Sequence, residues 1–164
     1  LTNSMTLPYE TQREIELFLL REAKLLDSGE FENWLALYAP EGIYWMPSQP
    51  GQTDPKGIAS IIYEDYAILA IRVRRLLEAR ALVLTPMPRT THLISNIEIT
   101  KEAADQFVAE ATFMCVEHQG DQQRLYSGRH VHHLVRQNGS FRIALKRVML
   151  ANCDASHAPM TIPI

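Results

Sequence analysis

The sequence has little glycine and almost no cysteine. Its 164 residues include seven glycines, and none falls into the spacing G-x-G-x-x-G or G-x-x-x-x-G-K-[ST] that binds nucleotide phosphates. The two cysteines, Cys115 and Cys153, are too few for a disulfide framework, a zinc ribbon or a thiolate-held iron–sulfur cluster. These absences argue against nucleotide chemistry and thiolate-held cofactors, and reduced thiols favour a cytoplasmic location.

Long hydrophobic runs and a surplus of one charge are also missing. No apolar run approaches the roughly 20 residues that cross a bilayer, and the first ten residues lack the pattern of a signal peptide. With 16 basic and 19 acidic residues, the formal charge of −3 leaves nothing to neutralise phosphates. We therefore expect neither a membrane nor a nucleic acid as partner, and a single domain over residues 1–164.

Helical spacing marks the first half of the chain. The capping-box pattern Thr11–Glu14 opens an apolar stripe and predicts an amphipathic helix. Apolar positions in 31–38 predict a second, short helix that ends near Pro40. Asp65 is a candidate cap for a third helix that reaches about Arg80.

Short strands and a loop separate the second helix from the third. Residues 43–46 are β-branched and aromatic and predict one strand, and residues 58–63 predict another. Ser48–Gly57 between them has no periodicity and predicts a surface loop. The residues Thr85–Pro88 then end the third helical pattern.

The second half alternates apolar and polar residues over four segments, 90–101, 106–118, 125–136 and 141–150. In the first segment, strict alternation puts Leu93 on one face with two isoleucines, Ile97 and Ile99, and His92 on the other face with Ile94. The fold class is α+β, with N-terminal helices packed on a strongly curved antiparallel or mixed sheet that encloses a conical cavity.

Asn138-Gly139 predicts a tight hairpin turn between the last two segments. This turn sets Leu134 opposite Ile143, His132 opposite Leu145 and His130 opposite Arg147, unless a bulge intervenes. The final residues, 158–164, are apolar and broken by proline, which predicts that they dock onto another surface.

The histidines do not complete a metal site. His130 and His132 share a strand face, as two imidazole ligands would, but the sequence signals no third ligand. Cys115 and His118 resemble half of a Rieske ligand set, and the spacing from Cys153 to His157 does not supply the other half. We therefore assign no catalytic, cofactor-binding or metal-binding residue.

Acid–base catalysis inside the cone remains an alternative. His92, Asn96, Tyr63 and Asp65 are its candidate members, because a buried carboxylate or imidazole can reach a pKa near neutrality. Such a chain would be a free-standing dehydratase or isomerase, and a cofactor-free ligand-binding module is a third reading. The sequence does not place these residues together.

Arginine and aromatic side chains are dense in the middle of the chain, and these types anchor protein interfaces. The residues that we expect at a partner interface are Tyr63, Tyr66, Arg72, Arg89 and His92.

The chain resembles the beta, or small, subunits of aromatic-ring-hydroxylating dioxygenases over nearly its whole length. Within that family it is similar to subunits of benzoate-type and toluate-type enzymes. The motifs that carry the resemblance, in order, are Phe18–Ala23 with Leu25–Asp27, Trp34–Tyr38, Tyr44–Pro47, Tyr63–Tyr66 with Arg72-Val73, Pro88–His92 with Ile94–Asn96, Gly128-Arg129, Phe141–Ile143 and Lys146–Val148.

The resemblance implies a cone like that of nuclear-transport-factor-like proteins, with no cofactor of its own. It implies assembly with an alpha subunit, commonly as an α3β3 hexamer with beta–beta contacts. The alpha subunit would hold a Rieske [2Fe-2S] cluster and a mononuclear iron, with electrons from NAD(P)H through a reductase. Such an enzyme adds both atoms of dioxygen to an aromatic ring and gives a cis-dihydrodiol. This chain would be mainly structural.

Overall fold

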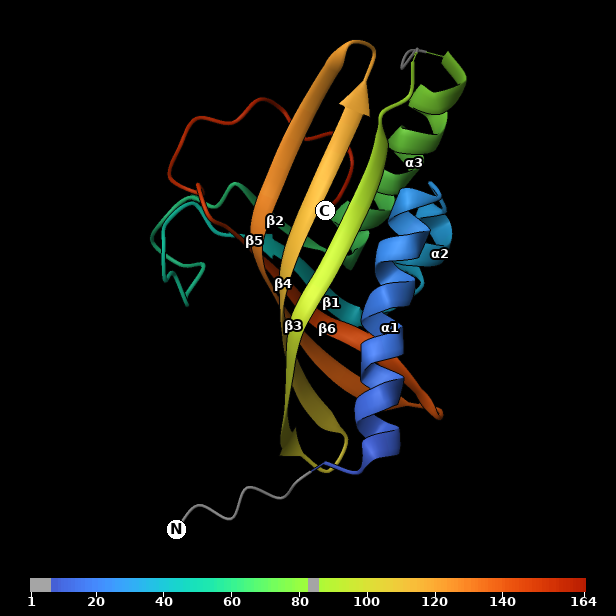
Figure 1. The fold of residues 1–164 in the computed structure, drawn as a ribbon, viewed down its shortest axis with the longest axis vertical. Coiled ribbons are helices and arrows are strands. Elements are labelled where there is room, and N and C mark those ends of the chain that lie inside the picture. Colours follow the sequence, from blue (N-terminus) through green and yellow to red (C-terminus); the bar gives the residue numbers. More distant parts are fainter. Residues whose placement is uncertain (1–6, 83–85) are drawn as a thin grey trace.

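The computed structural model describes residues 7–82 and 86–164 as three helices and one six-stranded sheet (Figure 1). The elements in chain order are α1 (Tyr9–Asp27), α2 (Phe31–Leu35), β1 (Tyr38–Met46), β2 (Ile62–Asp65), α3 (Tyr66–Leu82), β3 (Arg89–Ala103), β4 (Gln106–Gln119), β5 (Gln122–Gln137) and β6 (Ser140–Leu150). In the described residues no helix is both long and apolar enough to cross a membrane.

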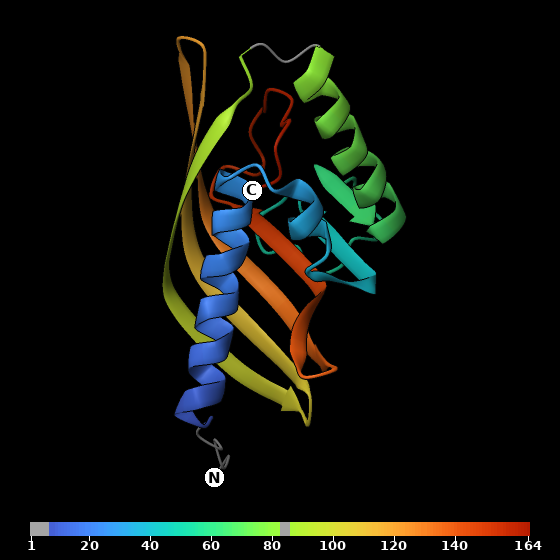
Figure 2. The same cartoon turned by 90° about the vertical axis from the view of Figure 1, so that its right-hand side faces the viewer.

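The sheet has the strand order β2-β1-β6-β5-β4-β3. Its strands pair antiparallel except β1 and β6, which run parallel, so the sheet is mixed. The long strands curl strongly, and Figure 2 shows all three helices on the same, concave side of the sheet. The predicted α+β cone is confirmed.

The sequence predicted the N-terminus of α3 correctly and that of α1 incorrectly. Asp65 caps α3 as predicted, since its Oδ1 accepts a hydrogen bond from the Ile68 amide at 3.0 Å. The capping box at Thr11 is wrong, because α1 already begins at Tyr9, after Pro8. Proline fixes a backbone angle suited to a helix start, and the Pro8 carbonyl accepts from the Gln12 amide at 3.0 Å.

The segment from α2 to β2 is shifted from the prediction. The second helix ends at Leu35 rather than near Pro40, and β1 starts at Tyr38. Residues 38–40 form a strand instead of a helix because they belong to β1, which lies between β2 and β6 and pairs with both. The strand expected at 58–63 instead spans Ile62–Asp65. The predicted break at 85–88 falls partly outside the described residues.

A bulge in β3 reverses the predicted facing of its first half. The register with β4 shifts between Ser95 and Glu98, where Asn96 adopts a positive φ of 51°. Because the bulge adds a residue, side chains before it change faces relative to those after it. Leu93 is therefore 65% exposed, whereas Ile94, Ile97 and Ile99 all pack against the core.

The β5–β6 hairpin is confirmed at its turn and wrong further along. Asn138 and Gly139 have φ of 51° and 75°, and Leu134 pairs with Ile143. A register shift between His133 and Leu134 then moves the partners by one, so His132 lies opposite Lys146 and His130 opposite Val148. The prediction held only if no bulge intervened, and a bulge does intervene.

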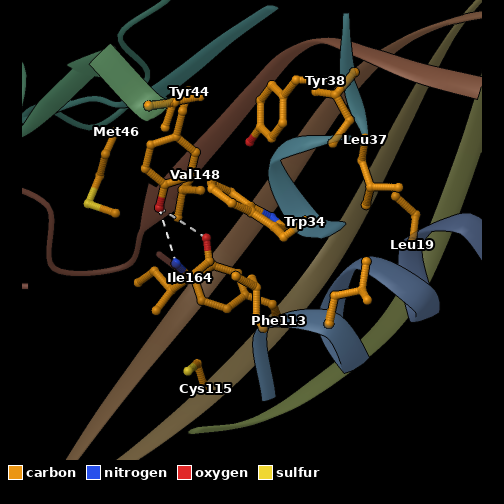
Figure 3. Packing of buried hydrophobic residues seen from close by; sticks show 14 of the residues in the cluster. Leu19, Trp34, Leu37, Tyr38, Tyr44, Met46, Phe113, Cys115, Val148 and Ile164 are labelled. Atoms are coloured by element: carbon orange, nitrogen blue, oxygen red, sulfur yellow. Dashed lines mark hydrogen bonds between the residues drawn. The ribbon is translucent and has the colours of Figure 1, made fainter. Parts of the chain in front are cut away.

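The core lies between the concave face and the helices (Figure 3). The apolar face predicted for β4 is confirmed, with buried residues Phe107, Ala109, Ala111, Phe113 and Cys115. The C-terminal residues dock as predicted, and the surface that receives them is this chain's own core, where Ile162 and Ile164 are buried.

The backbone of β6 leaves no room for a side chain at Gly128 of β5. A Cβ atom built there would lie 1.9 Å from the Met149 carbonyl oxygen, which is backbone and cannot step aside. The glycine thus allows the register that pairs Gly128 with Leu150.

We predict that Gly128→Ala lowers the free energy of unfolding by about 1–3 kcal/mol, since the strands must separate to admit a methyl group. Urea unfolding followed by circular dichroism measures the change. Ser127→Ala, one residue away, serves as the control with a change near zero. Equal stability of Gly128→Ala and the natural protein would contradict the close approach.

Candidate functional site

A cluster of charged side chains lies at the centre of the cone. Glu22 belongs to the apolar stripe of α1 and is 2% exposed. Its carboxylate accepts hydrogen bonds from Lys146 Nζ on β6 at 2.8 Å and from Trp34 Nε1 on α2 at 3.1 Å. His132 Nε2 on β5 lies 2.7 Å from the other carboxylate oxygen. Two helices and two strands therefore meet at one carboxylate.

The pKa values in this cluster follow from burial and from its charges. Burial by itself would raise the pKa of Glu22, but the Lys146 ammonium and the His132 ring hold it well below the usual range. Glu22 is therefore ionised and is neutralised by its partners. A buried charge that is paired and fully hydrogen-bonded holds its surroundings in place.

His130 is the second inward histidine of β5. Its ring stacks on Phe113 with centroids 3.9 Å apart and meets the His132 ring edge to face at 5.7 Å. Burial lowers the pKa of His130 well below its usual value, and the Lys146 charge lowers it further. His130 is therefore neutral at physiological pH, and its Nε2 has no hydrogen-bond partner among the residues that the structure describes.

A second ionisable pair joins the end of α1 to β3. Asp27 Oδ1 lies 2.6 Å from His92 Nδ1 and accepts from Thr90 Oγ1 at 2.9 Å, while Oδ2 accepts from the His92 amide at 2.9 Å. Burial raises the pKa of Asp27, yet the hydrogen bonds from His92 outweigh it and the net pKa is lowered. The His92 side chain is 1% exposed.

These pairs place His92 inside the fold, so an interface role for it does not fit. The other acid–base candidates do not join it. Tyr63 and Asp65 lie on β2, at the opposite edge of the strand order from β3, and Asn96 is exposed in the β3 bulge. Among the described residues, no group of three or more histidine, cysteine or acidic side chains could hold a metal ion.

The remaining expected interface residues lie in two places. Tyr63 is 47% exposed and packs edge to face on Trp45, while Arg72 on α3 pairs with Glu64 through Nε at 2.8 Å. Tyr66 is partly buried against the core. Arg89 is exposed at the start of β3, so the structure does not bring it to the same edge of the sheet.

Apolar side chains are exposed on the outer face of the sheet. Leu93 on β3 and Met114 on β4 are cross-strand partners, and Leu125 on β5 pairs with Val116 on β4. Beside them a largely apolar groove of about 570 Å³ runs between the loop residues Gln49–Gly51 and Met149. The expected loop at 48–57 thus forms one wall of a surface groove.

Known protein families, related sequences and solved structures were compared with this chain. The family model described as ring hydroxylating beta subunit matches residues 21–156. The chain belongs to this family. The small subunit of 2-halobenzoate 1,2-dioxygenase from Burkholderia cepacia is 33% identical over 144 residues, 85% of this chain and 87% of its own length.

Two further relatives agree. The beta subunit of toluate 1,2-dioxygenase from Pseudomonas putida is 38% identical over 104 residues, 60% of this beta subunit and 62% of its own length. The crystal structure of the benzoate 1,2-dioxygenase beta subunit from Burkholderia mallei superposes with a TM-score of 0.75 at 26% identity, covering 90% of this chain and 93% of that one.

Sequence reasoning missed the central ion pair of this beta subunit. Glu22 could have been found, because it interrupts an otherwise apolar stripe of α1 between Leu19 and Leu26. Lys146 had no such signal, since strict alternation from Ile143 puts Leu145 inside. The register shift in β6 reverses the facing and turns Lys146 inward.

We predict that Lys146→Met lowers the free energy of unfolding by about 3–5 kcal/mol, because it strands the Glu22 carboxylate in the core. Adding Glu22→Gln to Lys146→Met should restore more than half of that loss. Urea unfolding of the two single variants and the double variant measures the coupling. A double variant as unstable as the sum of both single changes would contradict the pairing.

Stability should fall as the pH drops from 7.5 to 5.5. The folded-state pKa of His130 lies below its unfolded value of about 6.5, so the unfolded chain binds more protons in this range. The contribution is complete above pH 6.5 and is lost progressively toward the folded pKa. His133, whose pKa burial also lowers, acts in the same direction.

His130→Phe, which can keep the stacking on Phe113, should flatten the pH dependence of the unfolding free energy. Leu93→Ala, which changes a 65% exposed side chain without an ionisable group, is the control and should leave the slope unchanged. A slope in His130→Phe equal to that of the natural protein would show that His130 is not the group responsible.

Proposed function

We propose that this chain is the small, or beta, subunit of the terminal oxygenase of an aromatic-ring-hydroxylating dioxygenase, with a mainly structural role. The family match over residues 21–156 carries the proposal. The named relatives belong to dioxygenases of 2-halobenzoate, toluate and benzoate, which supports an aromatic carboxylic acid as the substrate of the complex. The complex would convert it to a cis-dihydrodiol.

The interior supports a structural role for this chain. Glu22 is shared among three donors, and Asp27 is held by Thr90 and His92. A general base must be able to reach a proton on a substrate, and these carboxylates are already occupied by the fold. The same engagement disfavours the alternative of a free-standing dehydratase or isomerase that acts through His92.

The cofactors and the electron supply belong to the partners in this proposal. An alpha subunit would carry the Rieske [2Fe-2S] cluster and the mononuclear iron, and NAD(P)H would deliver electrons through a reductase. Both cysteines of this chain are unpaired and buried, as suits a cytoplasmic complex.

Exposed residues on separate parts of the surface support contacts with more than one other subunit. Tyr63 and Arg89 are exposed and lie on edge strands at opposite ends of the strand order, and Leu93 adds exposed apolar area on the outer face. A beta subunit of an α3β3 hexamer must contact an alpha subunit and other beta subunits. We assign Tyr63 and Arg89 to these contacts, together with Tyr66, which directly follows β2, and Arg72, which pairs with Glu64 on β2.

Co-expression with a Rieske-bearing alpha chain tests the proposal. We expect a brown hetero-oligomer with the mass of three alpha and three beta chains, measured by light scattering after gel filtration. The isolated beta subunit should be colourless and free of iron. Tyr63→Ala should weaken the complex by about tenfold or more, as truncation of an interface aromatic does.

Tyr9→Ala is the matched control, because Tyr9 is 77% exposed on α1 and the proposal gives it no contact. Iron bound stoichiometrically by this chain alone would overturn the proposal. So would turnover of an aromatic substrate by the isolated chain. A complex unaffected by both Tyr63→Ala and Arg89→Ala would remove the interface assignment and leave the subunit assignment standing.

A further inference from the structure

The groove of about 570 Å³ on the outer face of the sheet takes no part in the contacts described so far. Three small residues line it, Ser127 and Gly128 on β5 and Ala151 directly after β6. The Ala151 amide donates to the Ser127 carbonyl at 2.9 Å, which holds the two segments together. The longer side chains of Met114 on β4 and Met149 on β6 also line the groove. Small residues next to large ones make this part of the sheet surface concave.

The loop after β1 forms the remaining wall. Pro47 and Pro50 line the groove from this loop, which Figure 1 shows beside the sheet and away from the helices. The loop is held from below at Gln52, which is 9% exposed and whose main-chain oxygen accepts a hydrogen bond from Arg147 Nη1 at 3.5 Å. Ser48 Oγ closes the loop by donating to the Ala59 carbonyl at 2.5 Å. The wall is therefore formed by the chain itself, as in most small-molecule sites.

The groove has no uncompensated charge. Of the described residues that line it, only Arg129 is charged. Its guanidinium pairs with the carboxylate of Glu110, and Glu110 is not part of the groove lining. A carboxylate in the groove would have to compete with Glu110 for Arg129, and an ammonium group would find no counter-charge there. An ion would thus lose hydration without a partner in exchange, so the groove favours an uncharged occupant.

The two methionines favour an aromatic occupant. Met114 is 41% exposed at the groove, so its thioether is available to a ligand, and Met149 is partly exposed on β6. A thioether sulfur is polarisable and makes favourable contacts with aromatic rings, and the unbranched side chain adapts to the shape of its neighbour. A volume of about 570 Å³ lies within the range of small-molecule sites, which are mostly lined by apolar side chains.

We propose that this groove is a binding site for an uncharged, fused-ring aromatic molecule. The ring system lies on Ser127, Gly128 and Ala151, in contact with the thioethers of Met114 and Met149, and the loop after β1 covers one side of it. The site binds and catalyses nothing. It goes beyond the proposed function, because it needs no alpha subunit and excludes the aromatic carboxylates proposed as substrates of the complex.

Equilibrium dialysis of the full chain at pH 7.5 tests the site with two probes of the same ring system, naphthalene and 2-naphthoate. We expect one naphthalene to bind per chain, with a dissociation constant at least tenfold lower than that of 2-naphthoate, because only the carboxylate must give up its hydration. Lack of naphthalene binding would overturn the proposal. So would 2-naphthoate binding as tight as that of naphthalene.

Variants place the binding in the groove. Ser127→Leu and, from an exposed position, Ala151→Leu fill it and should each weaken naphthalene binding about tenfold or more. Ser95→Leu is the matched control, because Ser95 is exposed on β3 and does not line the groove. Glu110→Gln frees Arg129 and should strengthen 2-naphthoate binding severalfold without a change for naphthalene. Unchanged naphthalene binding in both groove variants, with native circular dichroism spectra, would overturn the proposal.

Discussion

The fold depends on keeping one buried carboxylate neutralised. Glu22 lies inside the cone, where an isolated charge would be prohibitively costly, and its compensation comes from Lys146, His132 and Trp34. These partners come from β6, β5 and α2. Because every member must be present at once, α1 can take only one position along the concave face of the sheet. The surrounding apolar core packs around that position.

The same arrangement occupies the ionisable groups inside the cone. Interior carboxylates and imidazoles in such a fold could supply acids and bases, but here Glu22 and Asp27 are consumed by contacts between helices and sheet. The interior therefore contributes rigidity. In the proposed complex, contact with other subunits falls to the outer sheet face, which the helices leave uncovered, and to the exposed side chains Tyr63 and Arg89.

Local signals in the sequence predicted local structure well. The Asn138-Gly139 turn and the Asp65 cap are confirmed, because each depends on the conformational preferences of a few adjacent residues. Errors arose where one extra residue in a strand reversed the facing of its neighbours. The shift in β3 separates Leu93 from Ile97 and Ile99 and exposes it, and the shift in β6 turns Lys146 inward.

The sequence by itself determined the order of elements, the α+β class, the family resemblance and the lack of ligand sets for a cluster. It did so because composition, turn residues and periodicity act over a few residues at a time. Only the tertiary structure decided the bulges in β3 and β6, the pairing of Glu22 with Lys146 across 124 positions, and the burial of Ile164 against Tyr44. Those features depend on which distant segments share the interior, and no local preference specifies that.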